Sequence, residues 1–484
     1  MHPMDLVKEI WSAAECDTRA LEQLRFSNTG WQLPSLFQVG ALAAATIGAQ
    51  ALAAAEIWRM RGGAAQTVEV DQRRALAMFR SERHVRVDGQ ALPDPWSPIA
   101  GYYQAGDGRW IQLHTNFEHH RDGVLRVLEC EDNRAAVAAA IAQWNAAELD
   151  ARLAQQGMCA ALIRSPQEWA ATEQAQAVAK LPLFDIERVA DAPPAAWAPA
   201  ADAAAPAGGA ATQAGYPARP LSGVRLLDLS RVIAAPVAGR TLAQHGADVL
   251  AVSAAHLPNL PALVVDTGRG KRSTQLDLRD PAQQEQLRQL IREADIFLHA
   301  YRPGALAARG FSTEELQKLR PGLIEVQLCA YSHAGPWAER RGFDSLVQSA
   351  SGIAWESALA AGVAQPDGQP GKLPCQALDH ATGYLGALVA MVALQRRAHA
   401  GGGWRARVSL AQTGHWLQSL PRVEGGMQHP ELTPEEIAPW MQAIPSSFGI
   451  VHAVAPVELM SATPPRFELP PAPLNAHPAS WNDI

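Results

Sequence analysis

Strands and helices alternate over residues 224–329, and this alternation limits the possible folds more than any other feature of the chain. The short apolar runs lie at 224–229, 247–252, 295–299 and 322–329, and the helical stretches between them at 236–246, 279–294 and 312–319. Apolar strands separated by helices are typical of a parallel sheet that is covered on both faces. The sequence therefore predicts an α/β fold with a parallel, Rossmann-like sheet and ligands at the carboxyl ends of its strands.

A long apolar segment at 380–396 predicts a buried helix, and Asp379 directly precedes it. An aspartate at a helix N-cap accepts hydrogen bonds from unpaired N–H groups and lies at the positive end of the helix dipole. We therefore expect this carboxylate to stay ionised even when it is partly buried. Most aspartates at such a position are ordinary caps, but a buried and oriented carboxylate is also a possible nucleophile.

Residues 191–215 contain little besides Ala, Pro and Gly, which indicates a linker. Two β-rich arms around Asp107-Gly108, followed by helical periods over about 120–180, predict a smaller α+β domain ahead of the linker. The predicted organisation is a helical leader at 1–33, a repeat helix with the small α+β domain at 34–190, the linker at 191–215, the Rossmann-like domain at 216–425 and a Pro-rich return segment at 426–484.

The helix predicted at 380–396 has a counterpart in the N-terminal half, in the Ala-rich helix at about 36–61. Aligning Thr46 to Arg61 with Thr382 to Arg397 places Ala43 opposite Asp379, and a glycine-rich stop and a short strand follow each helix. Two Ala-rich helices also resemble each other through composition alone. If the repeat is real, the N-terminal half keeps the helix and lacks the carboxylate.

Composition excludes several classes of protein. The formal charge of −7 gives no electrostatic reason to expect nucleic acid as a partner. Five scattered cysteines indicate neither a disulfide framework nor a zinc site, and the N-terminus lacks the pattern of a secretory signal. The segment from Leu36 to Ile57 is apolar, but its Ala content, two glutamines and Glu56 favour a buried helix over a membrane span. We expect a cytoplasmic protein with no membrane partner.

Several polar clusters follow the predicted strands in a fixed order. They are Ser230 to Pro236, Gly268 to Arg279, Ala300 to Gly304 and Gly335 to Asp344, with Asp379 after them. No G-x-G-x-x-G follows the first strand, so a nicotinamide or flavin site is not expected. In their order the blocks resemble the family III CoA-transferases, the group that contains formyl-CoA transferase, carnitine CoA-transferase and α-methylacyl-CoA racemase. The resemblance covers roughly residues 220–415.

The resemblance implies an acyl-CoA:carboxylate CoA-transferase in which Asp379 is the nucleophile and forms mixed-anhydride and aspartyl-CoA intermediates. It implies an acyl-CoA donor and a carboxylate acceptor as partners, coenzyme A as the only cofactor, and neither metal nor redox cofactor. The implied CoA contacts are Ile233, Ala234, Leu276, Arg279, Ala300, Tyr301, Arg302, Arg341 and Phe343. Arginine suits this role because its guanidinium group binds phosphate through two hydrogen bonds. The same cations could also be no more than a solvated rim.

The sequence departs from the family pattern at some positions. Ala235 stands where the family usually has glycine, and Ser253 where it usually has an acid, so the CoA pocket is expected to be altered. The small domain precedes the sheet here, which resembles a partly lost duplication or a permutation and predicts an internal pseudo-dimer or a homodimer. Two rival functions stay open: a CoA-dependent isomerase, which Phe343 disfavours because the racemase branch has histidine there, and a catalytically silent CoA-binding scaffold.

Overall fold

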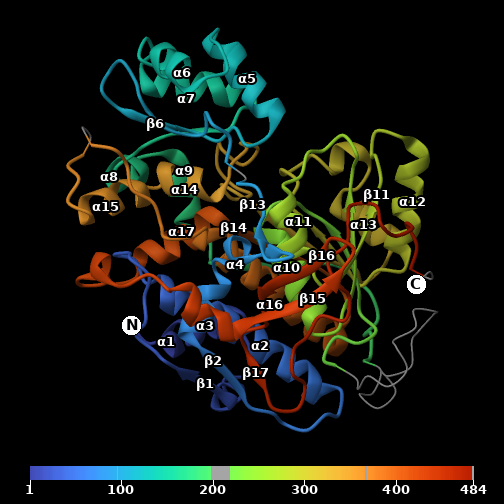
Figure 1. Cartoon of the computed structure of the whole chain (residues 1–484). Helices are drawn as coiled ribbons and strands as arrows, with labels where there is room; N and C mark the ends of the chain where they lie inside the picture. The colour runs from blue at the N-terminus through green and yellow to red at the C-terminus, as the bar shows by residue number, and fades with distance from the viewer. Residues whose placement is uncertain (95, 198–218, 366–367, 482–484) are drawn as a thin grey trace.

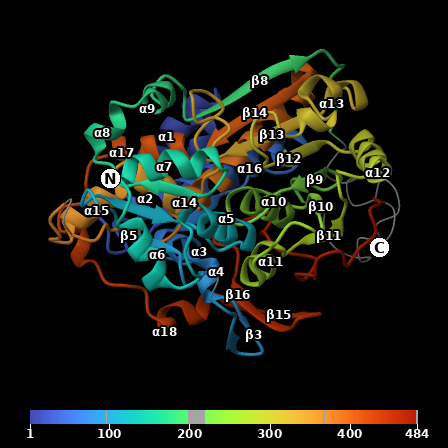
Figure 2. The ribbon, with the colours of Figure 1, turned by 90° about the horizontal axis from the view of Figure 1, so that it is seen from above.

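The structure is a computed structural model that describes residues 1–94, 96–197, 219–365 and 368–481. A seven-stranded sheet forms its centre, in the order β11-β10-β9-β12-β13-β14-β8, and its strands are parallel except where β8 meets β14. The strands are β8 (Phe184–Ala190), β9 (Arg225–Leu229), β10 (Asp248–Ser253), β11 (Lys271–Gln275), β12 (Ile296–His299), β13 (Ile324–Cys329) and β14 (Gly403–Ser409). Figure 2 shows them side by side across the molecule. The predicted α/β fold is confirmed.

Helices cover both faces of this sheet, because successive side chains of a strand point to opposite faces. In β9, Leu226 belongs to one apolar core and the next residue, Leu227, to a second core on the other face. The helices of the first core include α2 (Val39–Met60), α10 (Ala234–Gln244) and α16 (Ala377–Ala400), and those of the second α12 (Pro281–Arg292) and α13 (Thr313–Leu319). The carboxyl ends of the parallel strands are left free for a site.

The segment from Gly268 to Arg279, expected as a polar loop, contains a strand of the sheet. The short helix α11 (Pro261–Thr267) leads into β11, which lies at the sheet edge beside β10. The sequence did not predict this strand because it begins with two charged residues. In the structure Lys271 and Arg272 are buried in ion pairs with Asp228 (2.7 Å) and Asp248 (2.8 Å). These two buried cations stabilise the sheet and do not form a solvated rim.

The predicted linker at 191–215 lies for the most part outside the described residues. The strand before it, β8, pairs antiparallel with β14, which comes after it. The large sheet therefore contains residues from both sides of the linker. Sequence patterns could not predict this pairing. The unpaired backbone N–H and C=O groups at the edge of β14 accept another strand, and the composition of that strand does not specify it.

A smaller α+β unit stands apart from the large sheet (Figure 1). Its antiparallel sheet has the order β5-β6-β7, and three helices pack on it around a separate apolar core. The elements are β5 (Gly101–Gln104), β6 (Trp110–Leu113), β7 (Ala160–Leu162), α5 (Glu118–Leu128), α6 (Arg134–Ile141) and α7 (Ala146–Gln155). The hairpin turns at Asp107-Gly108, as the sequence predicts. A smaller α+β domain in the N-terminal half is thus present.

The C-terminal segment returns to the N-terminal half. In one small sheet β17 pairs with β2, and in another β16 pairs with β3. The strands of these two sheets are β1 (Leu24–Ser27), β2 (Val68–Asp71), β3 (Arg86–Val87), β4 (Gln90–Ala91), β15 (Met441–Ser446), β16 (Gly449–Val454) and β17 (Leu459–Met460). Both ends of the chain therefore help to hold the N-terminal half against the large sheet.

The helices of the proposed repeat, α2 and α16, pack directly against each other. Both are long and apolar enough to cross a membrane by composition, but 94% and 100% of their most apolar windows are buried inside the protein. They are core helices, as the sequence predicts for both of them. In the predicted register, Ala43 of α2 is fully buried.

The remaining elements connect these layers. They are α1 (Pro3–Ala13), η1 (Thr18–Gln23), α3 (Gln72–Met78), α4 (Ser81–His84), α8 (Pro166–Ala170), α9 (Glu173–Val178), η3 (Ala307–Arg309), α14 (Asp344–Ala350), α15 (Ile353–Ala360), α17 (Leu410–Ser419), η4 (Gly426–Gln428), α18 (Pro434–Ile437) and η5 (Ala438–Trp440). Two of them, α4 and α14, bring acidic residues to the start of α16.

Candidate active site

Asp379 is the third residue of α16 and not its N-cap. The helix begins at Ala377, and its N-cap residue is Gln376, whose side chain makes no capping bond. The backbone N–H of Asp379 donates a hydrogen bond to Asp344 Oδ2 at 2.8 Å, so the carboxylate of another residue satisfies this end of the helix. The predicted capping role of Asp379 is therefore wrong. Its carboxyl group does not cap the helix, and Asp379 lines two cavities.

Asp344 is the first residue of α14 and is 1% exposed. Gln348 Nε2, one turn further on, donates to Asp344 Oδ1, and Gln348 Oε1 accepts the backbone N–H of Leu373 at 2.8 Å. The hydrogen-bonded chain thus runs from α14 through two side chains to the segment before α16. It fixes the distance between the two helix starts and with it the place of Asp379.

The electrostatics of this pair differ from the sequence-based expectation. Burial raises the pKa of Asp344 to about 6. Burial, and then the charges of Asp344 and Glu82, raise the pKa of Asp379 well above its usual range. Desolvation and two nearby carboxylates thus outweigh the helix dipole, contrary to the expectation that the helix start favours the ionised form. A raised carboxyl pKa in a cleft is a recognised mark of a functional site.

Glu82 comes from α4 in the N-terminal half and lies at the same site. Its Oε2 is 3.1 Å from Nε2 of His380, the residue after Asp379, and the His380 ring stacks on Phe79 with ring centroids 5.3 Å apart. Nothing in the sequence indicates this contact, because Glu82 stands in an ordinary charged segment far from Asp379 in the chain. Only the packing of α4 near the start of α16 brings the two together.

Two cavities meet at Asp379, one of about 760 Å³ and one of about 360 Å³. The larger lies at the carboxyl ends of β9, β10, β12 and β13, as expected for a sheet of this kind. Of the sequence-predicted site residues, those that line it together with Asp379 are Ile233, Ala234, Ala300, Tyr301, Arg302, Arg341 and Phe343. Seven predicted contacts from three separate blocks are thus brought together.

Two predicted contacts do not line either cavity. Leu276 is buried in the core on the α12 face of the sheet. Arg279 lies on the surface, where its guanidinium group pairs with Asp277 at 2.6 Å. Both follow the end of β11, so a ligand would have to extend beyond the larger cavity to reach them.

Several arginines line the larger cavity, but they are not equally available to bind a ligand. The guanidinium group of Arg340 pairs with Asp150, and Arg309 donates to the backbone oxygen of Leu278 at 2.9 Å. Within the described parts of the chain, neither Arg302 nor Arg341 pairs with a carboxylate. Arg302 donates to the backbone oxygen of Glu339 at 3.3 Å, and Arg341 NH1 lies 3.0 Å from Nε2 of His120. These two cations are free to bind an anionic ligand.

The small domain contributes histidines that the sequence analysis missed. His114 stacks on the ring of Phe343, with centroids 3.7 Å apart and the planes 6° from parallel, and it lines the smaller cavity. Burial lowers the pKa of His114 to about 4, so its ring is neutral near pH 7. His119 and His120 line the larger cavity. The sequence did carry a signal, because three histidines follow directly after a predicted strand.

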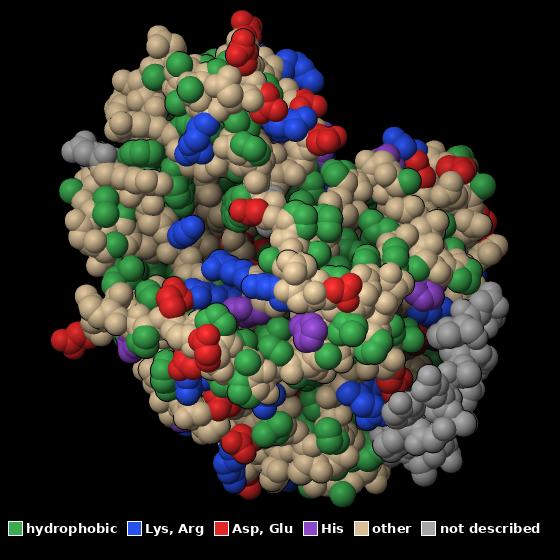
Figure 3. All heavy atoms as spheres, in the orientation of Figure 1, with side chains coloured by type: hydrophobic (Ala, Val, Ile, Leu, Met, Phe, Trp, Pro, Cys, Tyr) green, Lys and Arg blue, Asp and Glu red, His purple; other side chains and the backbone are tan. Residues whose placement is uncertain are grey.

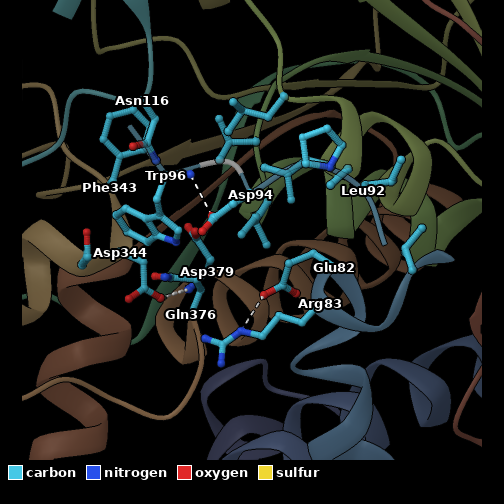
Figure 4. A pocket seen from close by; sticks show the side chains of 18 of the residues that line it. Glu82, Arg83, Leu92, Asp94, Trp96, Asn116, Phe343, Asp344, Gln376 and Asp379 are labelled. Carbon is cyan, nitrogen blue, oxygen red and sulfur yellow. Dashed lines mark hydrogen bonds and ion pairs between the residues drawn. The ribbon is translucent and has the colours of Figure 1, made fainter. Parts of the chain in front are cut away.

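Figure 4 shows the smaller cavity from close by. Asp344, Gln376 and Asp379 lie together, Trp96 and Asp94 are drawn next to them, and Glu82 and Arg83 lie to their right. On the face seen in Figure 3 the molecular surface is hollowed where the small domain meets the rest of the protein, and Lys and Arg side chains gather at the edge of this hollow. The site is thus formed by both halves of the chain.

A buried carboxyl group that faces a basic cavity at the strand ends suits covalent acyl transfer from a phosphorylated carrier. Residues 32–200 and 221–444 match the model of CoA-transferase family III, and the chain therefore belongs to that family. The match covers residues on both sides of the predicted linker.

Named relatives agree with this assignment. The chain is 31% identical to "Acyl-CoA transferase" of Gibberella moniliformis, over 66% of this chain and 56% of the relative, and 30% identical to "Acetyl-coenzyme A transferase nodX" of Hypoxylon pulicicidum, over 66% and 54%. It is 31% identical to "Succinate--glutarate CoA-transferase" of Agrobacterium fabrum, over 46% and 60%. The chain thus spans little more than half the length of these relatives. A crystal structure of Rv3272 from M. tuberculosis is 31% identical, covers 42% of this chain and 59% of its own, and has a TM-score of 0.38.

Proposed function

We propose that this chain transfers CoA from an acyl-CoA donor to a carboxylate acceptor, with Asp379 as the nucleophile. The observation that carries the proposal is the position of Asp379, which lines both the basic larger cavity and the smaller one. CoA would lie in the larger cavity with its phosphates near Arg302 and Arg341. The five cysteines are all free, which fits the cytoplasmic location that we propose.

The proposed reaction has four displacements. A carboxylate oxygen of Asp379 attacks the donor thioester carbon, the C–S bond breaks, and CoA leaves as a thiolate while a mixed anhydride forms. The thiolate attacks the Asp379 carbonyl carbon, which releases the donor acid and leaves an aspartyl-CoA thioester. The acceptor carboxylate attacks this thioester to give a new anhydride and free thiolate. The thiolate then attacks the acceptor's carbonyl carbon, which completes the new acyl-CoA and restores Asp379. Splitting the exchange in this way replaces one difficult step by easier ones.

Charge develops on a carbonyl oxygen in each displacement, and a donor near Asp379 would stabilise it. The backbone N–H groups at the start of α16 are not available for this role, because those of Leu378 and Asp379 bond to Asp344 and that of His380 donates to the backbone oxygen of Gln376. The hydroxyl group of Ser345 lines the smaller cavity and has no hydrogen-bond partner among the described residues. We assign the donor role to Ser345.

The experiment that tests the proposal is trapping of the acyl-enzyme. Incubation with an acyl-CoA and hydroxylamine should convert Asp379 to a hydroxamate, because hydroxylamine attacks the activated aspartyl carbonyl group. Peptide mapping by mass spectrometry locates the modified residue. Rapid CoA exchange without any modification at Asp379 would contradict the mechanism.

Replacing Arg302 or Arg341 by alanine should weaken CoA binding by about 1.5–3 kcal/mol, the usual value of a hydrogen bond to a charged group. Calorimetry with free CoA measures this. Arg292→Ala is the matched control, because Arg292 is an exposed arginine of α12 that pairs with Glu285. An effect no larger than that of the control would mean that the cations are a solvated rim. Arg279→Ala tests in the same way whether CoA reaches beyond the cavity.

Activity should depend on pH through the raised pKa of Asp379. Only the ionised carboxylate attacks a thioester, so kcat/KM should fall as pH decreases through this pKa, which lies well above that of an ordinary aspartate. Asp344→Asn removes one of the charges that raise it and should move the midpoint to lower pH, while burial keeps it above the ordinary range. Asp280→Asn, at the exposed N-cap of α12, should leave the profile unchanged. An unshifted profile in Asp344→Asn would show that the two groups do not interact.

One observation favours a second candidate, a CoA-dependent isomerase. Phe343 cannot exchange a proton, but His114 lies against it and lines the same cavity as Asp379, so a neutral imidazole is available there. An isomerase would exchange the α-proton of a 2-methylacyl-CoA into deuterated water at a rate comparable with turnover, and His114→Ala would abolish this. We expect no such exchange, because Phe343 stands at the position where the racemase branch has histidine.

A further inference from the structure

Apolar side chains from several parts of the chain line the smaller cavity. Most of its side chains are apolar, and those that are buried include Val85, Phe117, Ile233, Ala262 and Leu263. They come from four separate segments: the start of the β3–β4 hairpin, the loop after β6, the loop after β9 and the helix α11. The cavity is thus a built apolar chamber and not a surface groove.

The cavity has a buried acidic part and an exposed rim. Asp344 and Asp379 are buried, with Glu82 partly buried beside them. Asp94 and Arg83 are exposed, Arg83 at 3.6 Å from Glu82, and Trp96 is 42% exposed. A molecule that fills the cavity would therefore have its reacting end at the carboxyl groups and an apolar body along the buried walls (Figure 4).

The outer wall of the cavity is supported from behind by the C-terminal segment. Val85 packs in a separate apolar cluster with Val265 of α11 and with Val451 and Ala453 of β16, and Leu92 packs against the same cluster. Strand β16 also pairs with β3 in the hairpin that forms this wall. The wall is therefore held in place in the unliganded protein, which favours a preformed pocket.

We propose that this cavity holds the acyl group, and that the acyl group is uncharged, largely apolar and larger than acetyl. The inference rests on the proposed function, because it places the thioester carbon at Asp379 with CoA in the larger cavity. A volume of about 360 Å³ is within the range of ~300–1,000 Å³ found for ligand pockets. An acetyl group would leave most of this space empty, whereas a longer aliphatic group would remove the buried walls from water.

A second carboxylate on the acyl group is disfavoured by the charges of the cavity. Its buried part is acidic, and the exposed Arg83 already lies 3.6 Å from Glu82. The remaining cation, Arg86, donates through NH1 to the backbone oxygens of Arg83 and Val85. A succinyl-type group would have to desolvate its charge along apolar walls without a dedicated partner.

The first experiment is calorimetry of the whole chain with CoA, acetyl-, butyryl-, hexanoyl-, octanoyl- and succinyl-CoA. Affinity should rise from acetyl to octanoyl by about fourfold per methylene buried, and succinyl-CoA should bind no better than acetyl-CoA. Equal affinity across the aliphatic series, or tightest binding of succinyl-CoA, would overturn the proposal. The measurement does not depend on turnover, so it separates this proposal from the transferase activity itself.

The second experiment fills the cavity. Ala262→Phe on α11 should lower kcat/KM for octanoyl-CoA at least tenfold relative to acetyl-CoA, since Ala262 is buried in the wall. Ala91→Phe enters from the opposite, exposed wall and serves where the buried substitution impairs folding. Ala255→Phe is the control, because Ala255 is exposed on the loop after β10 and lines neither cavity.

The outcomes distinguish the two proposals. An unchanged chain-length profile in both cavity variants would overturn the acyl chamber while the transferase stands. Chain-length-dependent binding without any CoA exchange would overturn the transferase while the chamber stands.

Discussion

Asp379→Asn is expected to abolish CoA transfer and to leave the fold intact. An amide cannot form the mixed anhydride, and removing a nucleophile from other enzymes costs roughly 10⁴-fold or more in rate. The fold should tolerate the change because the raised pKa of Asp379 means that the site already favours a neutral side chain, which asparagine matches in shape. Unfolding free energy should change by no more than about 1 kcal/mol.

Coupled assays of acyl-CoA formation and denaturant unfolding measure the two effects separately. The matched control is Asp280→Asn, which removes an exposed helix-capping carboxylate far from the cavities and should change neither the rate nor the trapped peptide. Full transferase activity in Asp379→Asn would refute the mechanism. A loss of activity with a large loss of stability would instead assign Asp379 a structural role.

A fragment of residues 216–484 is expected to lose all activity and to aggregate or dimerise, even though it keeps Asp379. Three losses cause this. The fragment uncovers the face of α16 that packs on α2, opens the edge of β14 that pairs with β8, and removes the walls that Glu82, His114 and Phe117 give to the cavities. Large exposed apolar faces and open sheet edges drive association.

The control for this experiment is the complete chain with a protease site placed within 198–215. Cleavage there should leave the two halves associated and active, because the described contacts between them do not depend on the connecting segment. Gel filtration and the transfer assay follow both proteins. If the fragment alone is monomeric and fully active, the N-terminal half is an independent module, and our proposal of an internal pseudo-dimer with a single site is wrong.

The sequence by itself determined much of the large sheet. The strands at 225–229, 296–299 and 324–329 and the helices between them follow from local apolar patterns, because a buried parallel strand must be apolar on both faces. Seven of the nine predicted CoA contacts line one cavity for the same reason: loops after parallel strands meet at one edge of the sheet. Local sequence patterns were therefore sufficient to predict these strands and the loops after them, which the parallel sheet brings to one edge.

Tertiary structure alone decided the rest. β11 begins with two buried cations, and the sheet accommodates them because Asp228 of β9 and Asp248 of β10 neutralise Lys271 and Arg272. Glu82 and His114 reach the site through packing between halves that are hundreds of residues apart, which no local pattern encodes. The direction of the pKa shift of Asp379 was also decided by the tertiary structure. Its position in the helix favours an ionised carboxylate, but burial and two carboxylates from other elements determine its pKa, and only the folded chain sets their distances.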